Sequence, residues 1–369
     1  MPRKFKPSTP LSIGTEIELQ LIDIKSLDLS DKAALIVADI NDKKHIKHEL
    51  TRSMLEINSS VHLQLAELKQ ELTAQVQRVR AAAQRHQCDV TGGGRHLSND
   101  WKDQQITNAQ RYKKLASRFG YISKMACVFG QHIHIGVSNG DESIYLCHAL
   151  TPYFPQLLAL SASSPYYQGE DTLFASSRFS AQNSFPNYGC IEKVYSWQEF
   201  TEYYETLTAA GVIESIKDIY WDARPKPELG TVEIRVCDTP LHINHAANLV
   251  GYCRLIARYL LKNRHEIIPE YNAFSMYNKL NACRHGLQAD YVDAQTLQRC
   301  SLAEHILTTL ARLRPEAADD EERQLLQTLE RFVLRGANDA DNIRRLLDSG
   351  LTQPETIKRM CDALLVPIS

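Results

Sequence analysis

The sequence lacks the features that would place it at once in several common functional classes. No run approaches the 18 or more apolar residues of a membrane span. Residues 1–14 include basic side chains, but no continuous apolar stretch follows them, so we expect no secretory signal. A Walker A motif, a kinase glycine loop and the GxGxxG pattern are missing, as are repeats. Any nucleotide must therefore be bound by another arrangement of residues.

The nine cysteines include no CxxC pair, and an odd number does not suit a framework of disulfides. We therefore expect a cytoplasmic, reducing location, in which each cysteine is a small buried apolar residue. The net charge is only −2, and the pI is near 6.7. This balance of charges argues against nucleic acid or a membrane surface as the main partner. We therefore expect the partners to be small molecules.

Short alternating segments and longer helical segments follow one another along the chain. The patterns predict strands at residues 11–24, 124–138 and 232–236, and helices at residues 61–87, 104–119, 142–163 and 245–263. Residues 164–196 have little periodicity, and a loop of that length is usually functional. Because no βαβ rhythm is present, we predict an α+β fold with a mainly antiparallel sheet. Residues 1–295 would form the catalytic domain, and residues 296–369 a helical segment packed on it.

Two glutamates lie on one face of the first predicted strand, in Gly14-Thr15-Glu16-Ile17-Glu18. Residues i and i+2 of a strand point to the same side, so Glu16 and Glu18 are about 7 Å apart at the backbone. Carboxylates this close repel one another unless a cation or a basic group neutralises them. The alternative is a polar face exposed to solvent.

Two histidines share a strand face in the same way, in Gly130-Gln131-His132-Ile133-His134. A lone histidine with apolar neighbours is more often a core residue whose hydrogen bonds are satisfied. A pair at i and i+2, close to a glycine on each side, favours a metal ligand or a phosphate contact.

Further charged residues interrupt apolar runs. Glu233 and Arg235 share the face of another predicted strand, where they could form a simple ion pair. Glu56, with Glu49 shortly before it, breaks the run 54–58, and such a charge is seldom fully buried unless it is paired. Several carboxylates and one imidazole suit Mg²⁺ or Mn²⁺ better than structural zinc. Carboxylates with arginines nearby are typical of phosphoryl transfer.

These motifs resemble those of the second glutamate–cysteine ligase family, the YbdK-type carboxylate–amine ligases, which share the catalytic sheet of glutamine synthetase. The resemblance runs from Ile13 to about Asp290. Its segments, in the family's order, are Gly14–Glu18, Gly94–His96, Arg111–Tyr112, Gly130–His134, Ser176–Arg178, Trp221–Pro225, Gly230–Pro240 and Asn278–Leu287. Residues 92–97 depart from the family, because many relatives have a His-Pro pair there, and this predicts a loop of different shape.

The resemblance implies a curved antiparallel sheet that holds up to three divalent ions and the phosphates of ATP. The metal ligands that it implies are Glu16, Glu18, Glu49, Glu56, His132 and Glu233. It also implies that Arg235 neutralises the γ-phosphate and that His134 contacts phosphate or the acyl phosphate. Arg178 and Arg284 would anchor a carboxylate or a phosphate. Arg111 and Tyr112 belong either to the site or to the framework.

The implied function is an ATP- and Mg²⁺- or Mn²⁺-dependent ligase that forms an amide through an acyl phosphate. Its acid would be glutamate or a similar amino acid, with weak glutamate–cysteine ligase activity, and the amine is not specified. Two alternatives remain open: a guanidino-kinase-like phosphotransferase, and a non-catalytic protein that binds small molecules. The resemblance also leaves a homodimer open.

Overall fold

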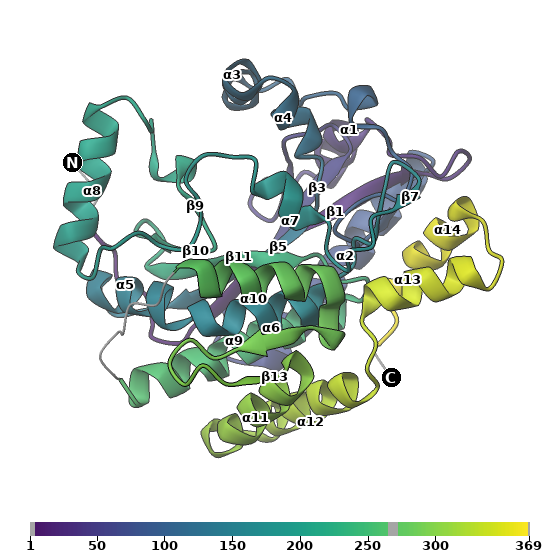
Figure 1. Ribbon diagram of the computed structural model, residues 1–369. Helices are drawn as coiled ribbons and strands as arrows, with labels where there is room; N and C mark the ends of the chain where they lie inside the picture. The colour runs from purple at the N-terminus through teal and green to yellow at the C-terminus, as the bar shows by residue number, and fades with distance from the viewer. Residues whose placement is uncertain (1–3, 265–271, 368–369) are drawn as a thin grey trace.

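A seven-stranded antiparallel sheet forms the centre of the protein (Figure 1). The computed structural model describes residues 4–264 and 272–367. The strands follow the order β10-β11-β5-β1-β3-β2, and β4 pairs with the C-terminal part of β1. Their bounds are β1 Ile13–Asp23, β2 Ile46–His48, β3 Met54–Asn58, β4 Cys88–Thr91, β5 Gly130–Gly136, β10 Ala223–Lys226 and β11 Thr231–Asp238.

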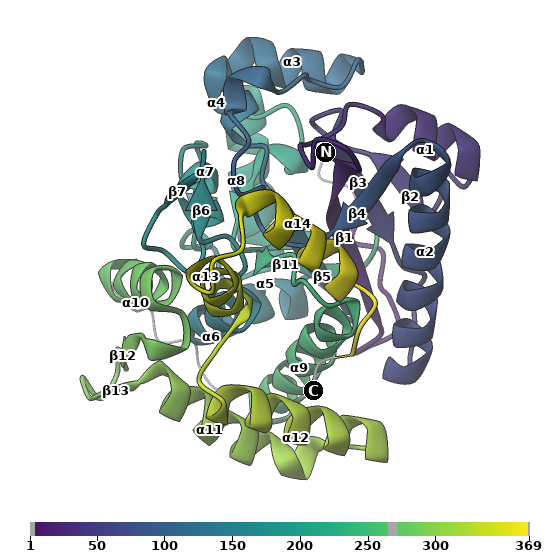
Figure 2. The ribbon, with the colours of Figure 1, turned by 90° about the vertical axis from the view of Figure 1, so that its right-hand side faces the viewer.

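One face of the sheet is apolar because alternate residues of its strands are apolar. Ile17 and Leu19 of β1 and Ile133 of β5 are fully buried on this face. Two long helices, α2 (Leu65–Arg85) and α9 (Ile243–Lys262), cover it (Figure 2). Burial of this face leaves the intervening polar residues of the same strands on the opposite side.

The register of the strands decides which of these polar residues are neighbours. The cross-strand pairs are Glu16–His132, Glu18–Glu56 and Glu233–His134. Each pair joins residues that are far apart in the sequence. The acids and histidines therefore collect on one area of the sheet, as their spacing of two residues predicts.

Shorter helices and three small strand pairs surround the sheet. The helices are α1 Ala33–Ile40, α3 Gln110–Phe119, α4 Tyr121–Met125, α5 Gly140–Ala149, α6 Phe154–Ser161, α7 Arg178–Gln182, α8 Trp197–Ala209 and α10 Asn272–His285. The small pairs are β6 Tyr166–Tyr167 with β7 Glu170–Asp171, β8 Tyr188–Gly189 with β9 Tyr220–Trp221, and β12 Asp290–Val292 with β13 Arg299–Ser301. Helices α3 and α4 project at the top of Figure 1, away from the body of the molecule.

The glycine triplet after β4 packs against the turn that follows β11. A Cβ atom on Gly92 would overlap the carbonyl oxygen of Pro240, and one on Gly94 would overlap the carboxylate of Asp238. The absence of side chains therefore allows the two segments to touch. Whether this loop differs in shape from that of relatives remains a prediction.

Four helices follow β13: α11 Leu302–Leu313, α12 Asp320–Leu334, α13 Asp339–Asp348 and α14 Gln353–Ala363. Three of them begin with capping boxes, formed by the pairs Ser301–Glu304, Asn338–Asp341 and Thr352–Glu355. Glu322 of α12 is fully buried and pairs with Arg254 and Arg258 of α9, at 2.6 and 2.7 Å. The C-terminal helices are thus fixed to a helix that covers the sheet.

The predicted α+β class, with a mainly antiparallel sheet and a helical C-terminal part, is confirmed. The division at residues 295 and 296 remains a prediction. Some element bounds were wrong. The helix expected from Gln104 begins at Gln110, because the backbone near Ile106 instead forms a bridge with Thr51.

Two other predicted elements divide in the structure. The strand expected from Lys124 begins at Gly130, because Gly120, with φ +55°, ends α3 and lets the short helix α4 follow. The helix expected over residues 142–163 is α5 and α6, separated by a 3₁₀ turn at Thr151–Tyr153. Pro152 in that turn has no N–H group to continue the first helix.

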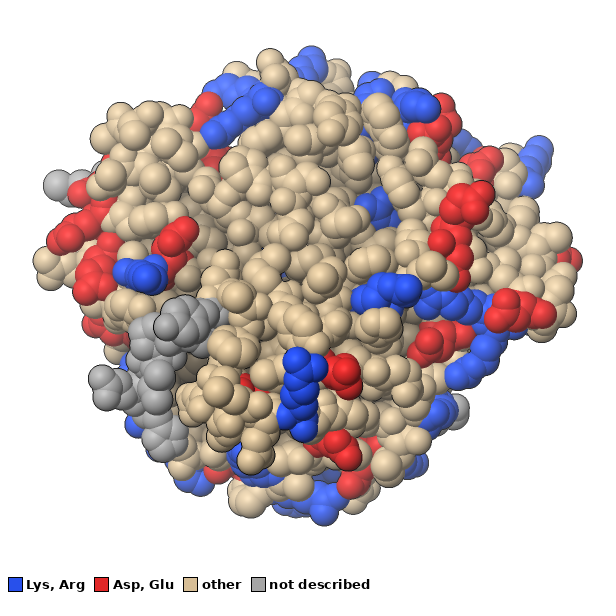
Figure 3. All heavy atoms as spheres, in the orientation of Figure 1, with Lys and Arg blue, Asp and Glu red and all other residues tan. Residues whose placement is uncertain are grey.

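The face shown in Figure 3 carries acidic and basic side chains mainly toward its edges, and neither sign forms a large continuous patch. Seven of the nine cysteines are buried, and the other two, Cys190 and Cys300, are half-buried. Within residues 4–264 and 272–367, every helix is too short or too polar to cross a bilayer. The cytoplasmic location remains a prediction.

Glu322→Ala should lower the melting temperature by about 5 °C, because it leaves the buried Arg254 without its carboxylate and costs about 3 kcal/mol. Thermal denaturation followed by circular dichroism measures the change. Glu330→Ala, on the same helix but in a solvent-exposed pair with Arg314, is the matched control and should shift the midpoint by about 1 °C or less. Equal effects of the two substitutions would show that the buried pair does not hold α12 in place.

Candidate active site

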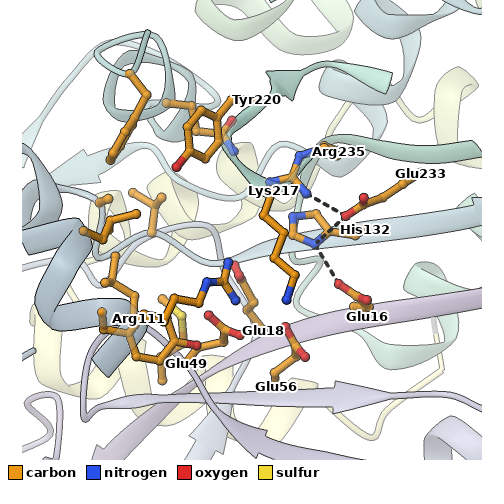
Figure 4. A pocket seen from close by; sticks show the side chains of 18 of the residues that line it. Glu16, Glu18, Glu49, Glu56, Arg111, His132, Lys217, Tyr220, Glu233 and Arg235 are labelled. Atoms are coloured by element: carbon orange, nitrogen blue, oxygen red, sulfur yellow. Dashed lines mark hydrogen bonds and ion pairs between the residues drawn. The ribbon is translucent and has the colours of Figure 1, made fainter. Parts of the chain in front are cut away.

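A cavity of about 490 Å³ lies over the polar face of the sheet (Figure 4). Strands β1, β3, β5 and β11 form its floor, and α3, the 3₁₀ helix Ile216–Asp218 and the segment from α7 to β8 form its sides. Among the described residues, those with a charge that line it are Glu16, Glu18, Glu49, Glu56, Glu233, Lys47, Arg111, Arg178, Lys217, Arg224, Lys226 and Arg235. Eight of the ten predicted site residues line this cavity.

The first acidic cluster consists of Glu16 from β1, His134 from β5 and Glu233 from β11. One ligand atom from each lies within 4.8 Å of the others. Neighbouring strands supply the three side chains, so the antiparallel register produces the grouping. Two carboxylates and an imidazole at this separation could hold a divalent ion.

The two histidines have different environments. His134 Nδ1 is 3.0 Å from the Thr231 hydroxyl, whereas its buried Nε2 forms no hydrogen bond to any described residue and lies 3.4 Å from Glu16 Oε1. Donation from Nδ1 to Thr231 leaves the Nε2 lone pair directed toward the cluster. His132 Nδ1 is 3.2 Å from Glu16 Oε2. Burial, with the charge of Arg235, lowers the pKa of His132 to about 4, so its ring is neutral at pH 7.

Three cations surround Glu233. Arg224 Nε, Lys226 Nζ and Arg235 Nη1 lie 2.7, 3.3 and 2.6 Å from its carboxylate oxygens. Burial alone would raise the pKa of Glu233, but these charges hold it well below its usual range. Burial alone would also raise the pKa of Glu16, but the adjacent His132 and His134 hold it well below its usual range. The carboxylates of the first cluster therefore remain ionised.

The second acidic cluster consists of Glu18, Glu49 and Glu56, which also bring ligand atoms within 4.8 Å of one another. The pKa values of these carboxyl groups are raised, whereas those of Glu16 and Glu233 in the first cluster are lowered. Burial raises the pKa of Glu18 to about 7, and burial together with the charge of Glu49 raises the pKa of Glu56 to about 8. Burial and the charge of Glu18 also raise the pKa of Glu49. Burial and the repulsion among its carboxylates outweigh the nearby charges of Arg178 and Lys47, so this cluster retains protons near neutral pH.

Arg178 forms part of the wall beside the second cluster. It is the first residue of α7, within the loop that the sequence predicted to be functional. Its side chain is 2% exposed, and its guanidinium lies against Gly130, where a Cβ atom would overlap it. Nη1 donates to Gln182 at 3.1 Å, and the positive charge partly offsets the raised pKa of Glu18. Gly130 N–H also donates to Glu18 Oε2 at 2.6 Å.

Two predicted site residues do not line the cavity. His134 is nevertheless part of the first cluster. Arg284 on α10 lies elsewhere, with its guanidinium 5.6 Å from the ring centre of Phe174. Its motif sits at the end of a helix that packs on α6, and the sequence does not show which way that helix faces.

The sequence interpretation missed Arg224 and Lys226 as site residues, although they make ion pairs with Glu233. A signal was present, because they alternate on a short strand directly before the strand of Glu233. It also missed an aromatic side of the cavity formed by Phe185, Tyr188 and Tyr220. Phe185 lies in a loop, and Tyr188 and Tyr220 begin strands of only two residues, which are too short for periodicity to indicate the direction of a side chain.

The charges of the cavity point to a strongly anionic ligand held together with cations. Among the described lining residues, five glutamates face seven lysines and arginines. The acids group into two clusters on the floor, whereas Arg111 and Lys217 reach in from the sides. Cation-binding acids beside unneutralised basic groups are the arrangement that binds a nucleotide triphosphate.

Comparison with known proteins agrees with this arrangement. Residues 12–363 match the family model for Glutamate-cysteine ligase family 2 (GCS2). A curated relative from Methylibium petroleiphilum, provisionally named glutamate–cysteine ligase 2, is 41% identical over 361 residues that cover 96% of each chain. A relative from Bordetella avium with the same provisional name is 43% identical over 346 residues, which are 92% of this chain and 85% of the relative.

Solved structures share the fold at lower identity. The glutamate–cysteine ligase of Francisella tularensis, in complex with AMP, superposes with a TM-score of 0.75 at 14% identity and covers 97% of this chain and 89% of that chain. A bifunctional glutathione synthetase from Pasteurella multocida superposes with a TM-score of 0.69 at 14% identity. The superposition covers 95% of this chain and 52% of that chain. The family relationship predicted from the motifs is confirmed: the chain belongs to Glutamate-cysteine ligase family 2 and is an ATP-dependent carbon–nitrogen ligase.

Proposed function

We propose that the enzyme activates a substrate carboxylate as an acyl phosphate and then joins it to an amine. The strongest support is that two acidic clusters, Arg235 and Arg178 meet in one cavity. The described residues that line this cavity include no serine, threonine or cysteine. A route without a covalent enzyme intermediate therefore suits them, and a carboxylate must be activated by ATP before an amine can displace an oxygen from it.

The two clusters fit Mg²⁺ or Mn²⁺. Their ligand atoms are carboxylate oxygens with at most one imidazole nitrogen, which is the donor set of these ions. Glu16, His134 and Glu233 would hold one ion, and the second cluster, Glu18, Glu49 and Glu56, would hold another. Bound ions would neutralise the phosphate oxygens of ATP during transfer and on the leaving phosphate.

The roles of the two histidines differ from those that the resemblance implied. We assign His134 as the metal ligand, because its free Nε2 lies at the cluster while Nδ1 is held by Thr231. We assign His132 as a neutral hydrogen-bonding residue that keeps Glu16 ionised and oriented. The order of the two histidines on the strand alone does not distinguish these roles.

Arg235 is assigned to the transferring phosphoryl group. Glu233 holds its guanidinium at 2.6 Å and so limits its motion. In the first step the bond between the γ-phosphorus and the β–γ bridging oxygen breaks, and a bond from that phosphorus to the substrate carboxylate forms. In the second step the amine attacks the acyl carbon, the bond to the phosphate oxygen breaks, and the nitrogen loses a proton. Arg178 would anchor the phosphate in both steps.

The acid substrate that we propose is glutamate or a similar amino acid, which the names of the relatives support. Glutamate–cysteine ligase activity would accompany it at a low level. The lining residues do not select one amine.

Mg-ATP should yield ADP and free phosphate in equal amounts only when an acid and an amine are supplied together. A panel of amino acids and amines, assayed for both products, tests this expectation. ADP without free phosphate would instead identify a kinase.

Glu233→Gln should lower turnover by about 100-fold or more, because it removes a ligand and frees three cations. Glu202→Gln, on the exposed side of α8, is the control and should retain the activity.

The assignment of the histidines predicts unequal effects on metal affinity. His134→Ala should weaken Mn²⁺ binding by about 10-fold or more, since a ligand is lost. His132→Ala should weaken it by only about twofold, because only the support of Glu16 is lost. Titration of Mn²⁺ followed by electron paramagnetic resonance measures both affinities without turnover. The reverse order of effects would return the ligand role to His132.

The second cluster predicts that magnesium binding strengthens with pH. The folded-state pKa values of Glu18 and Glu56, about 7 and 8, lie above the ordinary value of glutamate. The metal-free fold therefore loses stability as pH rises toward and through these values, and Mg²⁺ competes with the bound protons below them. The increase in melting temperature caused by Mg²⁺ should be larger at pH 8.5 than at pH 6, by about 2–4 °C.

The matched variant for this experiment is Glu56→Gln, which removes the group with the higher pKa value. It should reduce the difference between the two pH values and raise the stability of the metal-free protein at pH 8.5. An increase in melting temperature that is the same at both pH values would exclude proton displacement from the second cluster.

A further inference from the structure

A second, much smaller recess lies outside the cavity of the candidate active site. Its volume is about 10 Å³, which is the room that a single water molecule or a single ion needs. The loop that follows β4, the end of α4 and strand β6 enclose it. The described residues that line it include Arg95 and Tyr167 but no carboxylate.

Arg95 brings a buried positive charge to this recess. The residue is 4% exposed, and its guanidinium lies 4.3 Å from the centre of the Tyr167 ring. It forms no ion pair with any residue that the structure describes, and burial lowers its pKa. The guanidinium nevertheless stays protonated at neutral pH, because its ordinary pKa is above 12. A buried charge without a partner is unfavourable, so a counter-ion at this place would stabilise the fold.

The acid in this region, Asp238, is engaged by other groups. Its carboxylate accepts hydrogen bonds from the Ser163 N–H at 3.0 Å and from the hydroxyls of Ser164 and Ser176 at 2.7 and 2.8 Å. Its attraction is the smallest of the main effects on the pKa of Arg95. Asp238 therefore does not take the place of a counter-ion.

The polar groups around the recess offer donors, whereas their acceptors are occupied. Arg95 Nε and the Tyr167 hydroxyl are buried and have no hydrogen-bond partner among the described residues. Asn99 Oδ1 accepts from Gln104 Nε2 at 2.8 Å, and both ring nitrogens of His96 bond to backbone groups. A water molecule would need acceptors for its own protons, but an anion needs only donors.

The size and the remaining walls of the recess define the class of anion. A volume of about 10 Å³ excludes sulfate, phosphate and carboxylates and leaves an ion of one atom. The apolar side chains of Leu29 and Met125 also line the recess and cannot replace a strong hydration shell. These walls suit a weakly hydrated monovalent ion, for which the cost of desolvation is low.

The recess lies directly behind one wall of the active-site cavity. Met125 and Cys127 line the recess, whereas Ala126 and Val128 line the cavity. One short segment of chain thus separates the two spaces. Whatever fixes the recess side of this segment also fixes the wall beside the second acidic cluster.

We propose that the recess is a binding site for a monovalent halide ion, chloride in the first place, held by the Arg95 guanidinium and the Tyr167 hydroxyl. The ion would join the loop after β4 to strand β6. This loop already contacts the wall segment, because the Phe129 N–H donates to the Gly94 carbonyl at 2.9 Å. A bound ion therefore stabilises the wall of the cavity from outside. The site does not depend on the acyl-phosphate route.

Thermal denaturation in sodium chloride exchanged stepwise for sodium gluconate, at constant total salt, tests the site. Gluconate is too large for the recess, so chloride should raise the melting temperature by about 2 °C, with saturation. Tyr167→Phe removes one donor and keeps the ring, and it should raise the half-saturating chloride concentration by about 10-fold. Tyr166→Phe, the neighbouring change on β6 outside the recess, is the matched control and should behave as the wild type.

Crystals grown in sodium bromide locate the ion directly. A peak of anomalous scattering should lie beside Arg95 in the wild type and be lost in Arg95→Gln. Absence of the peak from the wild type would show that the recess holds water, and the proposal would be wrong. A chloride effect of equal size and midpoint in the wild type, Tyr167→Phe and Arg95→Gln would place the ion elsewhere and would also overturn it.

Two further points keep the outcome decisive. If Arg95→Gln does not fold, the bromide peak of the wild type and the chloride midpoint of Tyr167→Phe decide the question together. Failure of the proposed ligase reaction would leave both measurements unchanged, because neither includes a substrate.

Discussion

Mutual repulsion among five glutamates on one cavity surface is the constraint on which the rest of the site depends. The structure reduces this repulsion in two ways. Around Glu233 and Glu16 it places cations and histidines, so these carboxylates stay charged. Around Glu18 and Glu56, burial and the repulsion between carboxylates outweigh the nearby positive charges, so these groups hold protons until a cation replaces them. The two clusters are therefore different in kind, although both consist of acids on neighbouring strands.

The sheet makes this crowding compatible with a stable fold. Because side chains alternate along each strand, the residues between the acids are apolar and are buried under α2 and α9. The free energy of burying this face stabilises the same strands that hold the carboxylates together. A shift of β1 by one residue would exchange the two faces and remove both the core and the site.

The sequence alone predicted the parts of the site that depend on alternation along one strand. Glu16 with Glu18, His132 with His134, and Glu233 with Arg235 each lie together on the polar face of the sheet, as their spacing indicated. It did not predict which strands are neighbours, because register depends on long-range packing. For that reason the functional difference between the histidines, the ion pairs of Arg224 and Lys226, and the position of Arg284 became visible only in the structure. The acyl-phosphate route, the metal ions and the site roles remain proposals.

The mouth of the cavity is built differently from its floor. Helix α3 and the segment around Val212 lie outside the sheet and meet through a backbone carbonyl and an exposed ion pair. The ring of Phe119 on α3 also contacts Phe185 in the segment between α7 and β8. Changes in these segments would leave the strand register intact. A protein of this design can therefore acquire a new substrate preference at its entrance while its chemistry stays the same. The residues that should diverge first among related enzymes with different substrates are those of the entrance.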